Sequence, residues 1–185
     1  MDDVVEDMIV LIAVVILGLI IASFSFSYFT PKIAFANAQS DANTMASSIS
    51  ISTGPLIISG GQGSVLFEVY DPSYSYNYTV IAFVEPSSYS ASAGLVTPSI
   101  PPSTNSFSVY LPSGVKAYSM PLNTVYSLSG SILLTSGTGY TVPGNVPFTV
   151  KLPATSSDIV IIWVIYQDGG YNFRVDFAYS GVPST

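Results

Sequence analysis

The residues that could do chemistry in this 185-residue chain are few, because it contains no cysteine and no histidine. The chain therefore lacks thiolate nucleophiles, the commonest general base and the commonest transition-metal ligands. Carboxylates remain as candidates for the paired acid and base chemistry of glycosidases. Past residue 50 these are Glu68, Asp71, Glu85, Asp158, Asp168 and Asp176. Several stand beside proline or glycine, so we interpret them as solvated turn residues and expect no enzyme activity and no catalytic, cofactor or metal site.

Two other motifs with possible chemistry have structural interpretations. No serine has a histidine partner or stands in a G-x-S-x-G elbow, which excludes the usual serine hydrolase. The glycine-rich stretch "GGQGS" at Gly60–Ser64 precedes a predicted strand and lacks the lysine of a phosphate-binding loop. We therefore expect it to be part of a linker.

The composition limits the partners of the chain. Its net charge is −7, but only 8% of its residues are charged. Past residue 50 the basic residues are Lys116, Lys151 and Arg174, too few for a patch that neutralises phosphates, so no nucleic acid partner is expected. Serine, threonine, tyrosine, asparagine and glycine replace charge at the surface. Such a surface suits harsh conditions, attached glycans or crowded neighbours in an assembly.

The N-terminal segment is apolar over a membrane-spanning length. The run from Met8 to Phe29 has no charge and exceeds the ~20 residues that cross a bilayer core. It lacks the positive leading region and cleavage site of a secretory signal. Acids precede it and the first basic residue, Lys32, follows it, which taken alone would place the rest of the chain in the cytoplasm. The composition of that remainder is not typical of a cytoplasmic domain.

A second helical segment follows. Apolar residues recur at spacings of three and four beyond the membrane-length run, which predicts one apolar helical face. They are Phe35, Ala38, Ala42, Met45, Ala46 and Ile49. Pro31 predicts a kink or melted turn, so we expect a long kinked helix in two pieces, 3–29 and 32–50. Together the pieces would reach about 70 Å.

Past residue 50 the pattern changes to short alternating strands separated by turns. The apolar sets on one face of each are Val65, Phe67 and Val69; Tyr78, Val80 and Val84; Phe107, Val109 and Leu111; and Phe148, Val150 and Leu152. About seven such segments predict an antiparallel, immunoglobulin-like β-sandwich. The fold class is therefore α+β, with a helix over 1–50, a linker over 51–63 and a sandwich over 64–185.

The last predicted hairpin has an unusual first strand. The turn Asp168-Gly169-Gly170 joins a run that is apolar on both faces, 159–166, to a strand that alternates apolar and polar residues over 171–179. A strand apolar on both faces must be covered on both. We expect the second sheet on one face and a helix or a neighbouring subunit on the other.

One N-glycosylation sequon is present, Asn77-Tyr78-Thr79. Alternation along the predicted strand places Asn77 and Thr79 on the polar, outward side. Asn77 is therefore the candidate site for a glycan.

The layout resembles that of mature archaeal type IV pilins, a plan that archaellins share. The resemblance rests on the block "MIVLIAVVILGLIIASFSFSYF" at 8–29, the amphipathic continuation and the serine- and threonine-rich β domain. It implies that a prepilin peptidase removes a basic leader, that Met1 is the first residue after the cut, and that the helix enters a filament core with the help of a pilus assembly machinery. Bacterial type IV pilins carry glutamate at the fifth mature position, where this chain has Val5 followed by Glu6. The recurring archaellin opening is absent, which favours an adhesive pilin.

The residues expected to form the filament core lie along the whole helix. They are Met8, Ile9, Leu11, Ile12, Val15, Ile16, Gly18, Leu19, Ile20, Phe24, Phe35, Ala42 and Met45. Glu6 and Lys32 are candidates for charge pairing between subunits, although acids near a helix N-terminus are also stabilised by its dipole. The expected partners are thus copies of the chain itself, the membrane before assembly, and glycans on an extracellular surface.

Three alternatives remain: a membrane-anchored binding module, an archaellin, and an anchored hydrolase that uses two carboxylates. The apolar face over 32–50 favours a polymer over an anchor, because an anchor needs no such face outside the membrane. On this interpretation Ala42→Asp would abolish filaments and leave an anchored domain folded.

Overall fold

The chain divides into two compact units, Met1–Ala38 and Gln39–Thr185. The computed structural model describes residues 2–73, 76–98 and 107–181. Met1, expected to be the first residue after leader removal, lies outside the described residues. The fold is α+β, with a long apolar N-terminal helix followed by a β-sandwich, as the sequence predicts.

The helix α1 (Asp2–Ser48) is continuous through Pro31. The expected division into two helical pieces is therefore wrong. A proline removes one backbone hydrogen bond, but the turns on both sides keep theirs, so the helix continues past it. By length and composition α1 can cross a membrane, with a mean hydropathy of 3.0 in its most apolar part.

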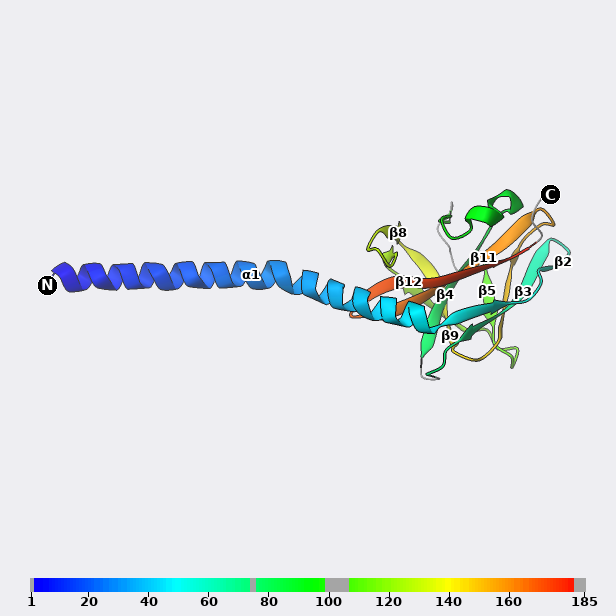
Figure 1. Ribbon diagram of the computed structural model, residues 1–185, viewed down its shortest axis with the longest axis horizontal. Coiled ribbons are helices and arrows are strands. Elements are labelled where there is room, and N and C mark those ends of the chain that lie inside the picture. The colour runs from blue at the N-terminus through cyan, green and yellow to red at the C-terminus, as the bar shows by residue number, and fades with distance from the viewer. Residues whose placement is uncertain (1, 74–75, 99–106, 182–185) are drawn as a thin grey trace. The chain divides into compact units, whose positions relative to one another are not determined.

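Two sheets form the β-sandwich within the described residues (Figure 1). The first sheet has the order β1 (Ser50–Thr53), β3 (Gln62–Tyr70), β10 (Phe148–Pro153), β5 (Ser108–Tyr110), with β2 (Ile57–Ser59) also paired to β3. The second has the order β6 (Tyr118–Leu122), β9 (Gly137–Pro143), β4 (Asn77–Pro86), β11 (Asp158–Asp168), β12 (Tyr171–Ser180), β7 (Val125–Tyr126), β8 (Ile132–Leu134). More strands are present than the sequence predicted, and β7 pairs with β12 in parallel.

The segment 51–63, expected to be a linker, is part of the first sheet. It forms most of β1, all of β2 and the first residues of β3. Ser59 pairs with Gln62 across a two-residue turn, in which Gly60 and Gly61 have φ of 60° and 77°. Two consecutive positive φ values are typical of the tightest hairpin turn, which glycine adopts without strain. The glycine-rich stretch is thus a hairpin turn.

The strand β11 lies at the centre of the molecule's packing and is buried on both faces, as expected. Alternation directs Val160, Ile162 and Val164 to one face, where the buried residues of the first sheet lie. Among the latter are the predicted sets Val65, Phe67 and Val69 of β3 and Phe148, Val150 and Leu152 of β10.

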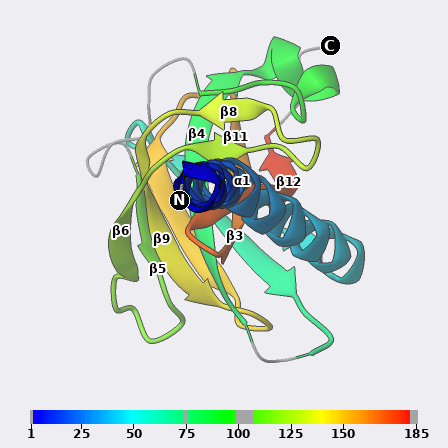
Figure 2. The ribbon, with the colours of Figure 1, turned by 90° about the vertical axis from the view of Figure 1, so that its left-hand side faces the viewer.

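The other face of β11 packs in a second hydrophobic cluster. Its members include Ile159, Ile161, Trp163 and Ile165 of β11 with Ile81 and Phe83 of β4, and Ala93, Leu122, Val125 and Leu134 from the segments that cover them. The 3₁₀ helix η1 (Ser87–Ser92) and β8 lie on the same side of β4 and β11 in both views (Figures 1 and 2). This cover comes from the chain's own β domain and includes the short helix η1, so a neighbouring subunit is not needed there.

The hairpin of β11 and β12 is confirmed, with Gly169 and Gly170 both at positive φ. A bulge interrupts it, because Val164 pairs with Asp176 while the next residue, Ile165, pairs with Arg174. The extra residue, Val175, shifts the alternation of β12. Arg174 consequently shares the face of Trp163, and Asp176 does not.

Gly139 in β9 tests the packing of the second sheet. A Cβ there would meet Thr79 Cγ2, lie 2.9 Å from Leu122 Cδ1 and 3.2 Å from the Val80 carbonyl oxygen. We expect Gly139→Ala to lower the free energy of unfolding by about 1–3 kcal/mol through overpacking. The measurement is chemical unfolding of the full chain in detergent, followed by Trp163 fluorescence. Gly18→Ala, where a Cβ meets nothing within 4 Å, is the control, and equal stability of both variants would contradict the packing described.

Candidate functional site

The first unit exposes apolar side chains on every side of α1. From Val4 to Ile33 the large hydrophobic residues are 47–73% exposed, and these include neighbours in sequence such as Leu11 and Ile12. Consecutive helical residues point about 100° apart, so no face is covered. A helix that is apolar all round is stable only inside a membrane or among other helices.

The predicted core residues in this unit are part of that exposed surface, except Phe35. Met8, Ile9, Leu11, Ile12, Val15, Ile16, Leu19, Ile20 and Phe24 are exposed. A Cβ added to Gly18 would meet nothing within 4 Å. Phe35 is partly buried. The geometry therefore suits burial by several neighbours at once.

Ala42 and Met45, in contrast, are already packed in the second unit. Ala42 is fully buried, and the Met45 sulfur accepts a hydrogen bond from the Tyr78 hydroxyl at 3.2 Å. Gln39 Nε2 donates to the Leu128 carbonyl at 2.7 Å. The apolar face of this last part of α1 thus covers the chain's own sandwich. Ala42→Asp would bury a charge in the folded domain itself, which corrects the expectation that the domain would stay folded.

Asp71 holds together the corner against which Met45 packs. Its carboxylate accepts hydrogen bonds from the Tyr78 hydroxyl (2.9 Å) and from the Ser73 backbone N–H (2.8 Å) and hydroxyl (2.5 Å). Asn145 donates its side-chain N–H to the Asp71 carbonyl at 2.6 Å and accepts the Asp71 N–H at 3.0 Å. Asp71 is 1% exposed. The expectation that it is a solvated turn acid is therefore wrong.

These contacts set the ionisation of the corner. Burial alone raises the pKa of Asp71, but the hydrogen bonds from Ser73 and Tyr78 outweigh it, so this pKa lies below the ordinary value of 3.8. Burial, then the hydrogen bond to Asp71, raises the pKa of Tyr78. The charged carboxylate and the neutral phenol are thus the stable forms.

The two residues proposed for charge pairing between subunits differ in their surroundings. Glu6 is exposed. Lys32 donates from Nζ to the Tyr28 hydroxyl at 2.7 Å and lies 4.1 Å from the centre of that ring. One turn of the same helix therefore already supplies Lys32 with a partner.

The sequon is only partly outward. Asn77 is exposed, as expected, but Thr79 is 3% exposed, with its hydroxyl 3.5 Å from the Met120 sulfur of β6. The predicted outward position of Thr79 is wrong because β9 and β6 extend the sheet beyond β4 and their side chains cover it.

Arg174 was not a predicted site residue. It is the only arginine of the chain, and it stands in a strand of alternating aromatic residues, which is the signal that could have identified it. Its Nη1 and the Trp163 Nε1 are buried atoms without a hydrogen-bond partner. Arg174 also lines a hollow at the edge of β12. In the described part of the chain no group of three or more potential metal ligands is found.

Comparisons with known proteins identify no relative by sequence. No protein-family model matches the chain, and no curated protein matches it. A solved structure that resembles it is the solution NMR structure of residues 27–141 of a conjugate transposon protein from Bacteroides vulgatus. The identity is 11%, the TM-score is 0.29, and the match covers 69% of this chain and 84% of that one. A TM-score of this size carries no argument about fold or function.

Tyr78→Phe tests the Asp71 corner. It removes a hydrogen bond to a buried carboxylate, so we expect the free energy of unfolding near pH 7 to fall by about 1.5–3 kcal/mol. The pKa of Asp71 is lower in the folded than in the unfolded chain. The ionised carboxylate therefore stabilises the fold fully above the unfolded pKa, and this stabilisation is lost as the pH falls through the folded pKa. Loss of the Tyr78 bond raises that folded pKa, so the loss of stability should begin at higher pH.

The measurement is urea unfolding of the full chain in detergent across pH 2–7. Tyr89→Phe is the control, because Tyr89 is 47% exposed and it is the Tyr89 carbonyl that accepts a hydrogen bond, from the Ser92 hydroxyl. If stability decreases toward low pH in the same way in the Tyr78→Phe variant and in the unsubstituted chain, the assigned role of Tyr78 is contradicted.

Proposed function

We propose that this chain is the structural subunit of an extracellular filament of the type IV pilus kind, which polymerises through the exposed apolar part of α1. The observation that carries the proposal is the exposure of large hydrophobic residues on all sides of the helix from Val4 to Ile33. In a bundle of parallel copies, each helix would be covered by others of the same composition. Before assembly, the bilayer would cover the same surface.

The length of the exposed segment supports a bundle. Residues 4–33 number 33 − 4 + 1 = 30, which is about 45 Å of helix at 1.5 Å per residue. A hydrocarbon core of ~30 Å covers about 20 of them. A single upright anchor would leave about ten residues of apolar helix in contact with water, whereas neighbouring helices would cover them.

The acidic start of the helix needs partners in such a bundle, because an isolated buried charge is very costly. Glu6 would pair with Lys32 or with the α-amine of a neighbouring copy. The hydrogen bond and ring contact between Lys32 and Tyr28 leave that ammonium a third donor for such a pair.

The remainder of the proposal follows from the resemblance to archaeal type IV pilins. A prepilin peptidase would release the mature helix, and an assembly machinery would extract it from the membrane. The sandwiches would form the filament's outer surface, carry glycans and adhere. An archaellin subunit of a motility filament is the related alternative.

A membrane-anchored binding module is the second candidate function. The observation that favours it is the packing of Ala42 and Met45 within the β domain. The apolar face over these residues has its partner in the same chain, so it no longer distinguishes a polymer from an anchor. Only the exposed helix of the first unit can therefore distinguish a polymer from an anchor.

Gly18→Leu separates the two candidates. The single chain has open space at Gly18, and a longer apolar side chain is favourable for a lone helix in lipid. Close helix packing through a small residue would be blocked. We expect filament yield to fall at least about tenfold, with unchanged subunit in the membrane, measured by shearing, electron microscopy and immunoblotting.

Two controls accompany this variant. Gly18→Ala adds one methyl group and should keep most filaments, and Leu95→Ala changes an 86% exposed residue of the β domain and should keep all. Normal filament yield from Gly18→Leu would contradict polymerisation through this part of the helix and leave the anchored module.

Asn77 gives a separate prediction about the surface. Its exposed side chain and the sequon predict a glycan in native material. Glycopeptide mapping should find residues 76–79 modified, and Asn77→Gln should lower the subunit mass by one glycan without loss of filaments. Recovery of all of the Asn77 peptide without a glycan would contradict the assignment.

A further inference from the structure

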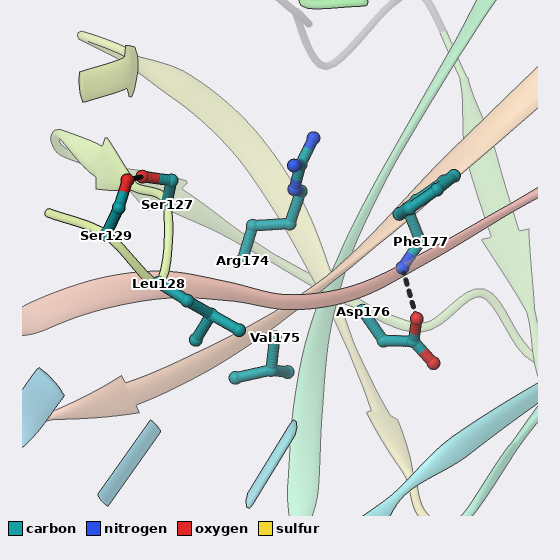
Figure 3. A pocket seen from close by; sticks show the side chains of 7 residues that line it. All are labelled: Ser127, Leu128, Ser129, Arg174, Val175, Asp176 and Phe177. Atoms are coloured by element: carbon teal, nitrogen blue, oxygen red, sulfur yellow. Dashed lines mark hydrogen bonds between the residues drawn. The ribbon is translucent and has the colours of Figure 1, made fainter. Parts of the chain in front are cut away.

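The edge of β12 has a hollow beside the end of β7. β7 pairs with β12 only at Asn172 and Phe173, so the next residues of β12 lack a strand neighbour on that side. A hollow of about 320 Å³ opens there, lined by residues 127–129 of the β7–β8 loop and 174–177 of β12 (Figure 3). We call it the edge notch.

The loop wall of the edge notch is held in place without a ligand. The Ser127 N–H donates to the Ser131 carbonyl at 2.8 Å, and the Ser131 N–H donates to the Ser127 hydroxyl at 3.0 Å. Gln39 of α1 donates to the Leu128 carbonyl. The Ser127 and Ser129 hydroxyl oxygens lie 2.8 Å apart, so the loop presents two adjacent hydroxyl groups. A preformed wall of this kind is typical of small-molecule sites.

Arg174 forms part of the other wall. Its guanidinium carbon lies 5.1 Å from the centre of the Trp163 ring and 5.5 Å from that of Phe177. Both distances lie within the range of cation–π contacts, which limit the movement of the guanidinium. Its buried Nη1 has no hydrogen-bond partner, and no ion pair of Arg174 is found in the described part of the chain. A fixed, unpaired guanidinium is suited to bidentate binding of a carboxylate.

The other groups of the edge notch match hydroxyl groups and an apolar ring face. One oxygen of Asp176 accepts the Phe177 N–H at 2.8 Å, and the second has no such partner among the described residues. The Phe177 ring is 39% exposed. In Figure 3, Arg174 and Phe177 lie on one side of the β12 ribbon and Asp176 on the other. All of these residues nevertheless line one hollow at the strand's edge, so a ligand that reaches round the edge would meet a cation, an aromatic ring, a carboxylate and two hydroxyls.

We propose that the edge notch binds a saccharide that carries a carboxylate, of which a uronic acid is the simplest member. The sugar carboxylate accepts hydrogen bonds from Arg174, its hydroxyls pair with Asp176 and with Ser127 or Ser129, and its C–H face lies on Phe177. A bare anion is a poorer match, because it would leave most of the volume empty and meet the Asp176 carboxylate. The inference concerns the β domain alone and holds whether or not the helix polymerises.

The only tryptophan of the chain, Trp163, contacts Arg174 and gives a direct signal. The experiment titrates the full chain, in a non-ionic detergent, with sodium glucuronate, glucose and sodium acetate. We expect a saturable change of Trp163 fluorescence with glucuronate, and affinities at least about tenfold weaker for the other two. Acetate binding as tightly as glucuronate would mean a carboxylate site only, and the absence of any saturable glucuronate signal would mean no site. Either result overturns the proposal.

Variants locate the binding. Arg174→Lys keeps the charge and loses the planar pair of donors, so we expect at least about tenfold weaker glucuronate binding. Asp176→Asn tests the hydroxyl contacts and should weaken glucuronate binding, whereas acetate, which no longer meets the Asp176 carboxylate, should bind no more weakly than before. Lys151→Met is the matched control, because Lys151 also lies over an aromatic ring, Tyr110, but on the first sheet. Unchanged binding in both notch variants, or equal loss in the control, would overturn the assignment.

Discussion

The burial of the apolar surface of α1 is the constraint on which the rest of the molecule depends. Between Val4 and Ile33 the large hydrophobic side chains of the helix are exposed among the described residues. Apolar area of this extent is not stable in water, and each exposed leucine or isoleucine left there costs about 1.5–3 kcal/mol relative to burial. The helix therefore needs a bilayer or other helices around it. Under the proposed function, filament assembly would exchange the bilayer for other helices.

The β domain, in contrast, satisfies its own burial on both faces of its central strand. η1, β7 and β8 cover the outer face of β11, and the last turns of α1 pack at the Asp71 corner. The basic side chains also have contacts within the chain. All four lysine and arginine side chains of the chain lie over aromatic rings, at 4.1–5.5 Å from the ring centres. Each of these cation–π contacts is favourable without an ion pair.

The features that could be predicted from the sequence are those that depend on local pattern. The apolar helix, the doubly buried run at 159–166 and the Asp168-Gly169-Gly170 hairpin follow from periodicity and turn residues. The features missed depend on pairing between distant segments. Thr79 is buried because β6 and β9 extend the sheet, and Asp71 because Tyr78 of β4 and Asn145 of the β9–β10 turn bond to it. The bulge at Val175 places Arg174 on the face of Trp163. No window of neighbouring residues contains that information.

The exposed helix and Arg174 differ in the kind of partner that they would bind. The helix presents apolar area on every side, which binds without direction and suits repeated copies of itself. Arg174 presents one buried donor in a fixed plane, which binds only an acceptor of matching geometry. Arg174 lies outside the exposed helical segment, so occupation of one need not alter the other. A polymer built through the helix would repeat the edge notch once per subunit, and a weak single affinity would then become strong wherever an acidic saccharide is itself displayed many times over.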